Sequence, residues 1–109
     1  MASKQEVVDF LVGQIQTAGD IIAKKMFGEY GVYCDGKMIA LVCDDQLFVK
    51  PTLGGKEYLG EVEEAPPYPS AKNWFLIPED DWDDAPRLST LIKITTAEVP
   101  LPRKKNSKQ

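Results

Sequence analysis

Short apolar runs alternate with tight turns between residues 20 and 50. Gly28-Glu29 places glycine where a type II′ turn needs a positive φ, and Asp35-Gly36 is a strong signal for a two-residue hairpin loop. Asp44-Asp45 is a weaker turn, because neither residue adopts a positive φ as easily as glycine. The three turns predict four strands, the first over residues 20–27, paired as an antiparallel meander.

Helices are predicted on both sides of this meander. Ser3 and Glu6 fit a capping box, and apolar residues at helical spacing continue towards Gly19: Val7, Leu11, Ile15 and Ala18. Near the other end of the chain, Asp84 or Asp83 caps a second helix. One side of that helix carries the residues that we expect to face the core: Leu88, Leu91, Ile92 and Thr95.

The segment between the meander and the second helix has a less regular pattern. Gly54-Gly55 indicates a turn, and residues 56–60 are consistent with a short helix. Residues 65–69 contain three prolines, which lack the N–H donor that a sheet requires, so this part is predicted to be a stiff, irregular connector. Residues 73–77 predict a fifth strand, which ends at Pro78.

Together these elements predict an α+β fold of two layers. It consists of an N-terminal helix, an antiparallel sheet of about five strands (a meander over residues 20–50 plus residues 72–77) and a C-terminal helix. A chain of 109 residues is long enough for a single core. We expect one domain over residues 1–102, followed by a basic, disordered tail over residues 103–109.

Alternation along the strands sorts the side chains of the meander onto two faces. The first face, apolar except for Lys24, is expected to pack against the helices; it holds Ile22, Met26, Tyr33, Met38, Ala40, Val42, Leu47 and Val49. The second mixes apolar side chains with lysines; it holds Phe27, Tyr30, Val32, Ile39, Leu41 and Phe48, with Lys25, Lys37 and Lys50. Because an exposed sheet face is usually more polar, we expect a helix, a second subunit or a ligand to cover part of it.

The net charge of −4 is unevenly distributed. Four basic residues lie near the C-terminus: Arg103, Lys104, Lys105 and Lys108. Without them, the chain has 9 basic and 17 acidic residues. A body with a charge of about −8 repels phosphate, so direct DNA binding is not favoured. No apolar run approaches the ~20 residues of a membrane span, and no signal peptide is evident, so we expect a cytoplasmic protein without a membrane partner.

Few residues suit catalysis or metal binding. The chain has no histidine, which is the commonest general base and metal ligand. Cys34 and Cys43 are expected to lie roughly 20 Å apart in the sheet and to remain free thiols. A thiol pKa lowered by Lys37 is an alternative to a plain strand role for Cys34. Charge at a helix N-terminus explains the carboxylates of residues 79–84 more simply than a metal site does. We therefore predict no catalytic residue, cofactor or metal.

Three segments resemble the N-terminal domain of the TfoX/Sxy family, regulators of natural competence. They are MFGEYGVYCDGKMIALVCDDQLFVKP (residues 26–51), PPYPSAKNWFLIPED (66–80) and PLPRKK (100–105). Glu29 and Ser70 stand where glycine is common in the family, and both are mild turn substitutions. The resemblance implies a two-layer α/β fold and carries no catalytic residue to this chain. Full regulators resemble this domain followed by a helical domain of helix-hairpin-helix character, so the resemblance does not imply transcriptional regulation by this chain alone.

Three functional interpretations follow. The first is a non-enzymatic regulatory or protein-interaction module that binds a protein partner, or itself as a homodimer, through the second sheet face and the proline connector. The second is nucleic-acid binding, with aromatic side chains of that face stacking on bases, and its lysines and the basic tail meeting phosphates. The third is a small-molecule or enzymatic pocket near Tyr68 and Lys72. The predicted interaction surface comprises Phe27, Tyr30, Ile39, Leu41, Phe48, Lys50, Tyr68 and Lys72.

Overall fold

A computed structural model describes residues 5–26 and 29–100. The predictions for Ser3, Phe27, Gly28 and the basic tail lie outside these residues. Within them the chain forms helices and strands in the order α1 Gln5–Gln14, β1 Ile21–Met26, β2 Glu29–Cys34, β3 Lys37–Cys43, β4 Gln46–Val49, α2 Leu53–Leu59, β5 Glu63–Ala65, β6 Trp74–Ile77 and α3 Ala85–Glu98. Short 3₁₀ helices cover Gln16–Ala18 and Glu79–Asp81. The α+β prediction is confirmed.

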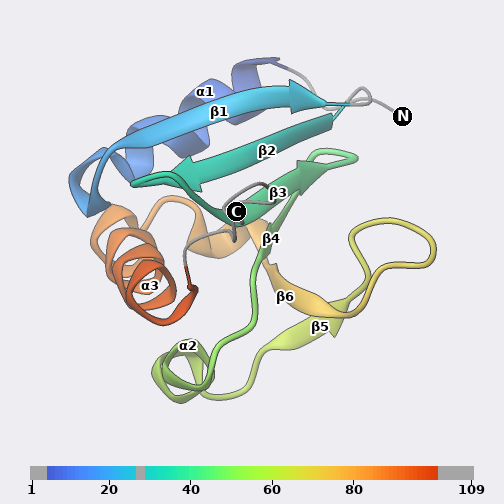
Figure 1. The fold of residues 1–109 in the computed structure, drawn as a ribbon, viewed down its shortest axis with the longest axis vertical. Helices are drawn as coiled ribbons and strands as arrows, with labels where there is room; N and C mark the ends of the chain where they lie inside the picture. Colours follow the sequence, from blue (N-terminus) through green and yellow to red (C-terminus); the bar gives the residue numbers. More distant parts are fainter. Residues whose placement is uncertain (1–4, 27–28, 101–109) are drawn as a thin grey trace, which may run out of the picture.

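The strands form one antiparallel sheet in the order β1-β2-β3-β4-β6-β5. Helices α1 and α3 pack on one face of it, and α1 lies behind β1 and β2 in Figure 1. The main core lies between these layers, where Leu11 of α1, Ile92 of α3 and Val42 of β3 are buried in the same cluster. The sheet has six strands among the described residues, because the short β5, absent from the sequence-based prediction, pairs with β6.

Two of the predicted hairpin turns have the expected geometry. Asp35 and Gly36 have φ angles of 53° and 84°, and Asp44 and Asp45 have φ angles of 54° and 58°. Positive φ at both central positions is the requirement of a type I′ turn. In the first hairpin, Tyr30 lies opposite Lys25. A turn centred on Gly28-Glu29 would have placed it opposite Phe27, so the register differs by two residues, a shift that keeps every side chain on its predicted face.

The prediction of the two faces fails because of a single extra residue, Ile39. Val32 pairs with Ala40 but Tyr33 pairs with Met38, so Ile39 is an extra residue in β3, a β-bulge. Ile39 and Ala40 are both buried in the main core. A one-residue insertion reverses the alternation on one side of the bulge relative to the other.

The bulge moves residues of the first two strands to the opposite face from the one predicted. Tyr30 and Val32 belong to the core beneath the helices, together with Val42 and Val49. Four side chains that were expected in that core lie instead on the other face, beside Leu41 and Phe48: Ile22, Met26, Tyr33 and Met38. We call this face, which α1 and α3 do not cover, the outer face.

The region around the second and third helices shows both a correction and a confirmation. Gly54 and Gly55 lie inside α2, not in a turn. The Thr52 hydroxyl caps this helix by accepting a hydrogen bond from the Gly55 N–H at 3.0 Å. As predicted, Asp84 caps α3 and accepts a hydrogen bond from the Arg87 N–H at 3.1 Å.

No helix among the described residues is both long and apolar enough to cross a bilayer.

Candidate functional site

A second, smaller apolar cluster lies on the outer face of the sheet. Leu41, Cys43 and Phe48 form its buried part, and partly buried side chains pack around them: Met38, Ala65, Trp74 and Leu76. The cross-strand pair between Leu41 and Phe48 places both on the same side of β3 and β4. This cluster is the base on which the candidate site is built.

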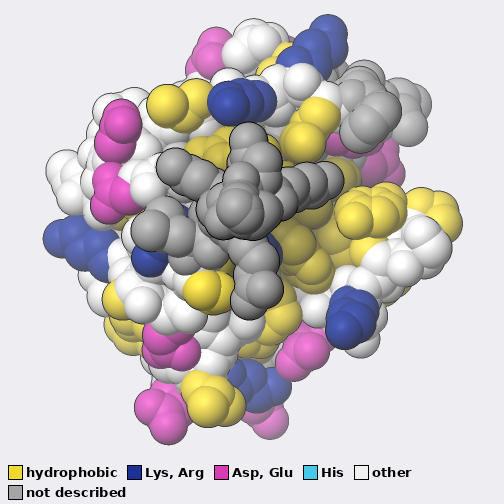
Figure 2. All heavy atoms as spheres, viewed as in Figure 1, with side chains coloured by type: hydrophobic (Ala, Val, Ile, Leu, Met, Phe, Trp, Pro, Cys, Tyr) yellow, Lys and Arg dark blue, Asp and Glu magenta, His cyan; other side chains and the backbone are white. Residues whose placement is uncertain are grey.

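A groove of about 700 Å³ lies against this cluster, and we call it the outer groove. Met26 of β1 and Met38 and Leu41 of β3 line it from the sheet. The proline connector forms the opposite wall, and the remaining apolar lining is Cys43, Pro67, Tyr68, Pro69 and Trp74. Figure 2 shows apolar side chains gathered around a hollow on this face, between the strands and the connector.

The connector wall combines a fixed backbone with an exposed aromatic ring. Pro67 is buried, whereas 55% of the Tyr68 surface is exposed. The Ala71 N–H donates a hydrogen bond to the Tyr68 carbonyl at 3.1 Å, which closes a turn beyond the ring. Trp74 stands next to this wall, and the Lys50 ammonium lies 5.6 Å from its ring centre, a cation–π contact. The wall therefore offers two aromatic rings next to apolar strands.

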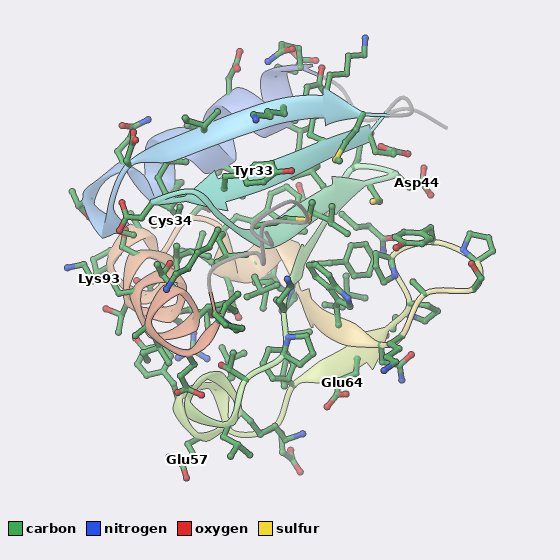
Figure 3. The ribbon with its side chains drawn as sticks, viewed as in Figure 1. Tyr33, Cys34, Asp44, Glu57, Glu64 and Lys93 are labelled. Carbon is green, nitrogen blue, oxygen red and sulfur yellow. The ribbon has the colours of Figure 1, made fainter. Side chains whose placement is uncertain are left out.

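Two acidic residues, Glu29 and Asp44, complete the lining of the groove. Asp44 lies in the β3–β4 turn at the rim of the groove (Figure 3). Tyr33 of β2 lies on the outer face as well. The Asp44 N–H donates a hydrogen bond to a Glu29 carboxylate oxygen at 3.2 Å, which ties the two strand ends together. This part of the rim is negatively charged, whereas Lys50 brings a positive charge near Trp74.

Neither thiol has the properties of a nucleophile. Burial, with smaller contributions from Glu29 and Asp44, raises the pKa of Cys43 to about 11. Burial also raises the pKa of Cys34 and outweighs the smaller lowering by Lys37, which contradicts the alternative of a lowered thiol pKa. The Lys37 ammonium instead donates a hydrogen bond to the Thr96 carbonyl at 2.8 Å. Both cysteines are free, as predicted, and both are expected to remain protonated at neutral pH.

The structure brings together only part of the predicted interaction surface. Leu41 and Tyr68 line the outer groove and Phe48 lies beneath it. Lys50 lies over the neighbouring Trp74, and Lys72 is exposed without lining the groove.

The other predicted members lie elsewhere. The bulge places Tyr30 and Ile39 in the main core, so their assignment to one face with Leu41 and Phe48 was wrong. The same reversal separates Tyr30 from Phe48, which removes the continuous aromatic and lysine face of the nucleic-acid interpretation. Phe27 lies outside the described residues.

Some lining residues were missed by the sequence reasoning. Met26 and Met38 were assigned to the core, and Trp74 was not among the residues of the predicted interaction surface. The signal that was available is the proline connector directly before the fifth strand: a stiff segment next to a strand end is a natural wall for a groove. The position of Ile39 in the bulge had no comparable signal.

Comparison with known proteins places the chain in a family. The family described as the TfoX N-terminal domain matches residues 13–99. The chain is also 33% identical over 108 residues to an uncharacterised 12.7 kDa protein from the trpE 5′ region of Spirochaeta aurantia, a match that covers 99% of this chain and 93% of that relative. The family match includes β1 to β6, α2 and α3, and so contains the whole outer groove. The chain therefore belongs to the TfoX N-terminal domain family.

Proposed function

We propose that this protein is a non-enzymatic interaction module of a regulatory system, which holds an apolar segment of a partner protein in the outer groove. The groove itself carries the proposal, because a hollow of about 700 Å³ is available on a sheet face that α1 and α3 leave free. Contiguous exposed apolar surface of this kind commonly marks an interaction site. Membership of the TfoX N-terminal domain family, which the sequence resemblance connects with regulators of natural competence, supports a role in a regulatory system.

The lining indicates the chemistry of the partner. Met26 and Met38 have flexible, polarizable side chains that adapt to apolar groups of different shape. Tyr68 and Trp74 offer aromatic contact area, which is enriched at protein interfaces. Glu29 and Asp44 attract positive charge to one part of the rim. The favoured partner segment is therefore apolar, with a lysine or arginine next to its apolar residues.

The titratable groups favour binding over catalysis. The chain has no histidine. The raised pKa values keep both thiols protonated. Among the described residues, no three His, Cys, Asp or Glu side chains lie where they would share a metal ion. Among the described residues of the groove, Cys43 lies beside Glu29 and Asp44, but its raised pKa opposes the thiolate that a covalent mechanism needs.

A displayed library of random peptides, selected on the purified protein, tests the proposal. We expect the recovered peptides to contain apolar residues flanked by lysine or arginine. Their affinity, measured by fluorescence anisotropy, should fall at least about tenfold in Tyr68→Ala and Met38→Glu, since both residues line the groove.

Leu53→Ala is the matched control, because Leu53 is 83% exposed on α2 and does not line the groove. It should leave the affinity unchanged. Selected peptides that bind the two groove variants as tightly as the original protein would contradict the proposal. So would a stable dimer in light scattering that Met38→Glu dissociates, because a second copy would then be the occupant.

A further inference from the structure

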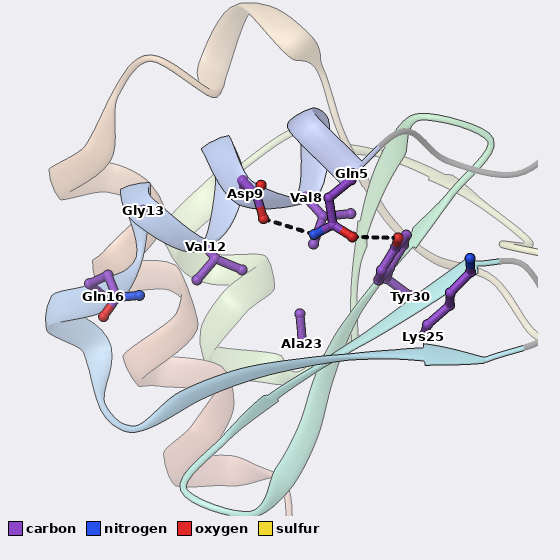
Figure 4. A pocket seen from close by; sticks show the side chains of 9 residues that line it. All are labelled: Gln5, Val8, Asp9, Val12, Gly13, Gln16, Ala23, Lys25 and Tyr30. Carbon is purple, nitrogen blue, oxygen red and sulfur yellow. Dashed lines mark hydrogen bonds between the residues drawn. The ribbon is translucent and has the colours of Figure 1, made fainter.

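A separate cleft of about 510 Å³ lies on the helix side of the sheet, between α1 and β1. Val8 and Val12 of α1 and Ala23 of β1 provide its apolar surface. Figure 4 shows Val8 and Val12 directed from the helix towards the strand, with Lys25 at one end and Gln16 at the other. The cleft runs along the edge of the sheet, because β1 is the terminal strand.

Hydrogen bonds hold the cleft at one end. The Tyr30 hydroxyl donates to the Gln5 side-chain oxygen at 2.8 Å, and the Gln5 amide donates to an Asp9 carboxylate oxygen at 2.8 Å (Figure 4). Tyr30 belongs to β2 and Gln5 to α1, so these two hydrogen bonds connect the helix to the sheet. A spacing fixed in advance lowers the ordering cost of filling the cleft.

Among residues 5–26 and 29–100, no strand pairs with the side of β1 that faces away from β2, so its backbone is open there. The Asp35 N–H donates to the Asp20 carbonyl at 3.0 Å, so the backbone of Asp20 faces β2. In an antiparallel pair, successive residues point their N–H and C=O groups to opposite sides. Ile22, Lys24 and Met26 therefore bond to β2, whereas the backbone groups of Ile21, Ala23 and Lys25 point away from the sheet.

The open edge also carries two positive charges. Lys24 and Lys25 are exposed, and within the described part of the chain neither ammonium lies within 4.0 Å of a carboxylate. Lys24 lies 5.0 Å from the ring centre of Tyr33 on the outer face, and Lys25 lines the cleft. One lysine on each side of the strand therefore faces a segment laid against it.

We propose that β1 accepts an extended, acidic segment of a partner protein as an additional strand. The outward N–H and C=O groups of Ile21, Ala23 and Lys25 would extend the sheet, and alternate side chains of the segment would enter the cleft between β1 and α1. Addition of a strand to an open edge is a common mode of peptide recognition. Because side chains alternate along a strand, the carboxylates of such a segment lie on the outer face and pair with Lys24, while Lys25 on the cleft side adds attraction at longer range.

A second copy of this chain is a poorer occupant of the same edge. Antiparallel pairing of two β1 strands centred on Lys24 or Lys25 would place that lysine directly opposite its own copy. Like charges on neighbouring strands are destabilising. An acidic segment uses the same backbone groups without this repulsion, so the charge of the edge selects it.

Fluorescein-labelled peptides of alternating valine and glutamate are the probe, with alternating valine and lysine as the matched basic control. We expect saturable binding of the acidic peptide alone, weakening with salt. Lys24→Glu with Lys25→Glu should reduce its affinity at least about tenfold. N-methylation of alternate peptide bonds on the edge-facing side should abolish binding, because it removes the ladder donors.

Ala23→Pro tests the backbone directly. It removes an outward N–H while leaving every hydrogen bond between β1 and β2, and proline is tolerated at such edge positions. It should weaken binding of the acidic peptide. In the original protein, hydrogen exchange should show new protection of the Ala23 and Lys25 amides on peptide addition, with no change at Lys24.

The proposal fails if the acidic and basic peptides bind equally, or if neither binds, in which case the lysines serve only to guard the edge. It also fails if the edge substitutions leave binding unchanged while Tyr68→Ala weakens it, since the peptide would then occupy the outer groove. Because the cleft and the outer groove lie on opposite faces of the sheet and share no lining residue, failure of one proposal leaves the other standing.

Discussion

The close contact between α2 and the rest of the core depends on Gly55. This residue is buried in the first turn of α2. A Cβ atom added there would lie 2.8 Å from the Thr52 hydroxyl oxygen, 3.2 Å from the Phe75 ring and 3.4 Å from a Leu91 methyl. Gly55→Ala therefore adds a methyl group where the surroundings have no room for it.

The size of the effect follows from three contributions. Alanine is favoured over glycine in a helix by about 1 kcal/mol. Displacing the Thr52 hydroxyl from the Gly55 N–H costs about 1 kcal/mol of capping. Overpacking against Phe75 and Leu91 costs about 1–3 kcal/mol. We expect the free energy of unfolding to fall by about 1–3 kcal/mol, with the melting temperature reduced by roughly 4–8 °C for each kcal/mol.

Urea and thermal unfolding followed by circular dichroism measure this change. Gly13→Ala is the matched control, because Gly13 is exposed in α1 and an added Cβ would meet nothing within 4 Å. It should raise the free energy of unfolding by about 0.5–1 kcal/mol. A Gly55→Ala protein as stable as the Gly13→Ala protein would refute the close packing of α2 that the reasoning assumes.

Three further predictions concern single contacts. Asp84→Ala should cost about 1 kcal/mol by removing the cap of α3, while Asp83→Ala, a neighbour without that bond, should change stability by less than about 0.5 kcal/mol in the same unfolding assay. Tyr30→Phe should cost about 1 kcal/mol through loss of the bond to Gln5, and chemical-shift changes should reach α1. Folding raises the pKa of Cys43 from 9.0 to about 11, so the protonated thiol stabilises the folded protein at pH values below 9.0. This contribution is lost as the pH rises towards about 11, so Cys43→Ala should flatten the decline in the free energy of unfolding measured over that range.

The elements that sequence reasoning predicted well are those controlled by local chemistry. Asp35-Gly36 and Asp44-Asp45 lie at the predicted turns because short polar residues and glycine tolerate positive φ. Asp84 lies at the predicted helix start, where its carboxylate accepts a backbone N–H. In each case a few neighbouring residues determine the geometry, and the sequence displays all of them.

The outcome at the sheet faces depended on packing that the sequence does not display. Apolar side chains fill both faces of β3. Pairing with or without a bulge at Ile39 would therefore bury apolar residues equally well, and the sequence does not distinguish the two. The two glycines of α2 were predicted to form a turn. They are small because α2 packs closely against α3 and β6, and the residues that make this contact lie far along the chain, where a local pattern does not reveal them. The candidate groove was accordingly predicted only in part: Leu41 and Tyr68 were identified, and Met26 and Met38 were assigned to the opposite face.

The extra residue in β3 has a consequence for comparisons among relatives. If one member of the family lacked a counterpart of Ile39, its second strand would present the other set of side chains to the groove while most neighbouring letters stayed the same. Aligned identity near this position would then overstate functional likeness. Ligand preferences are therefore best transferred between homologues only after the strand pairing on each side of residue 39 has been established.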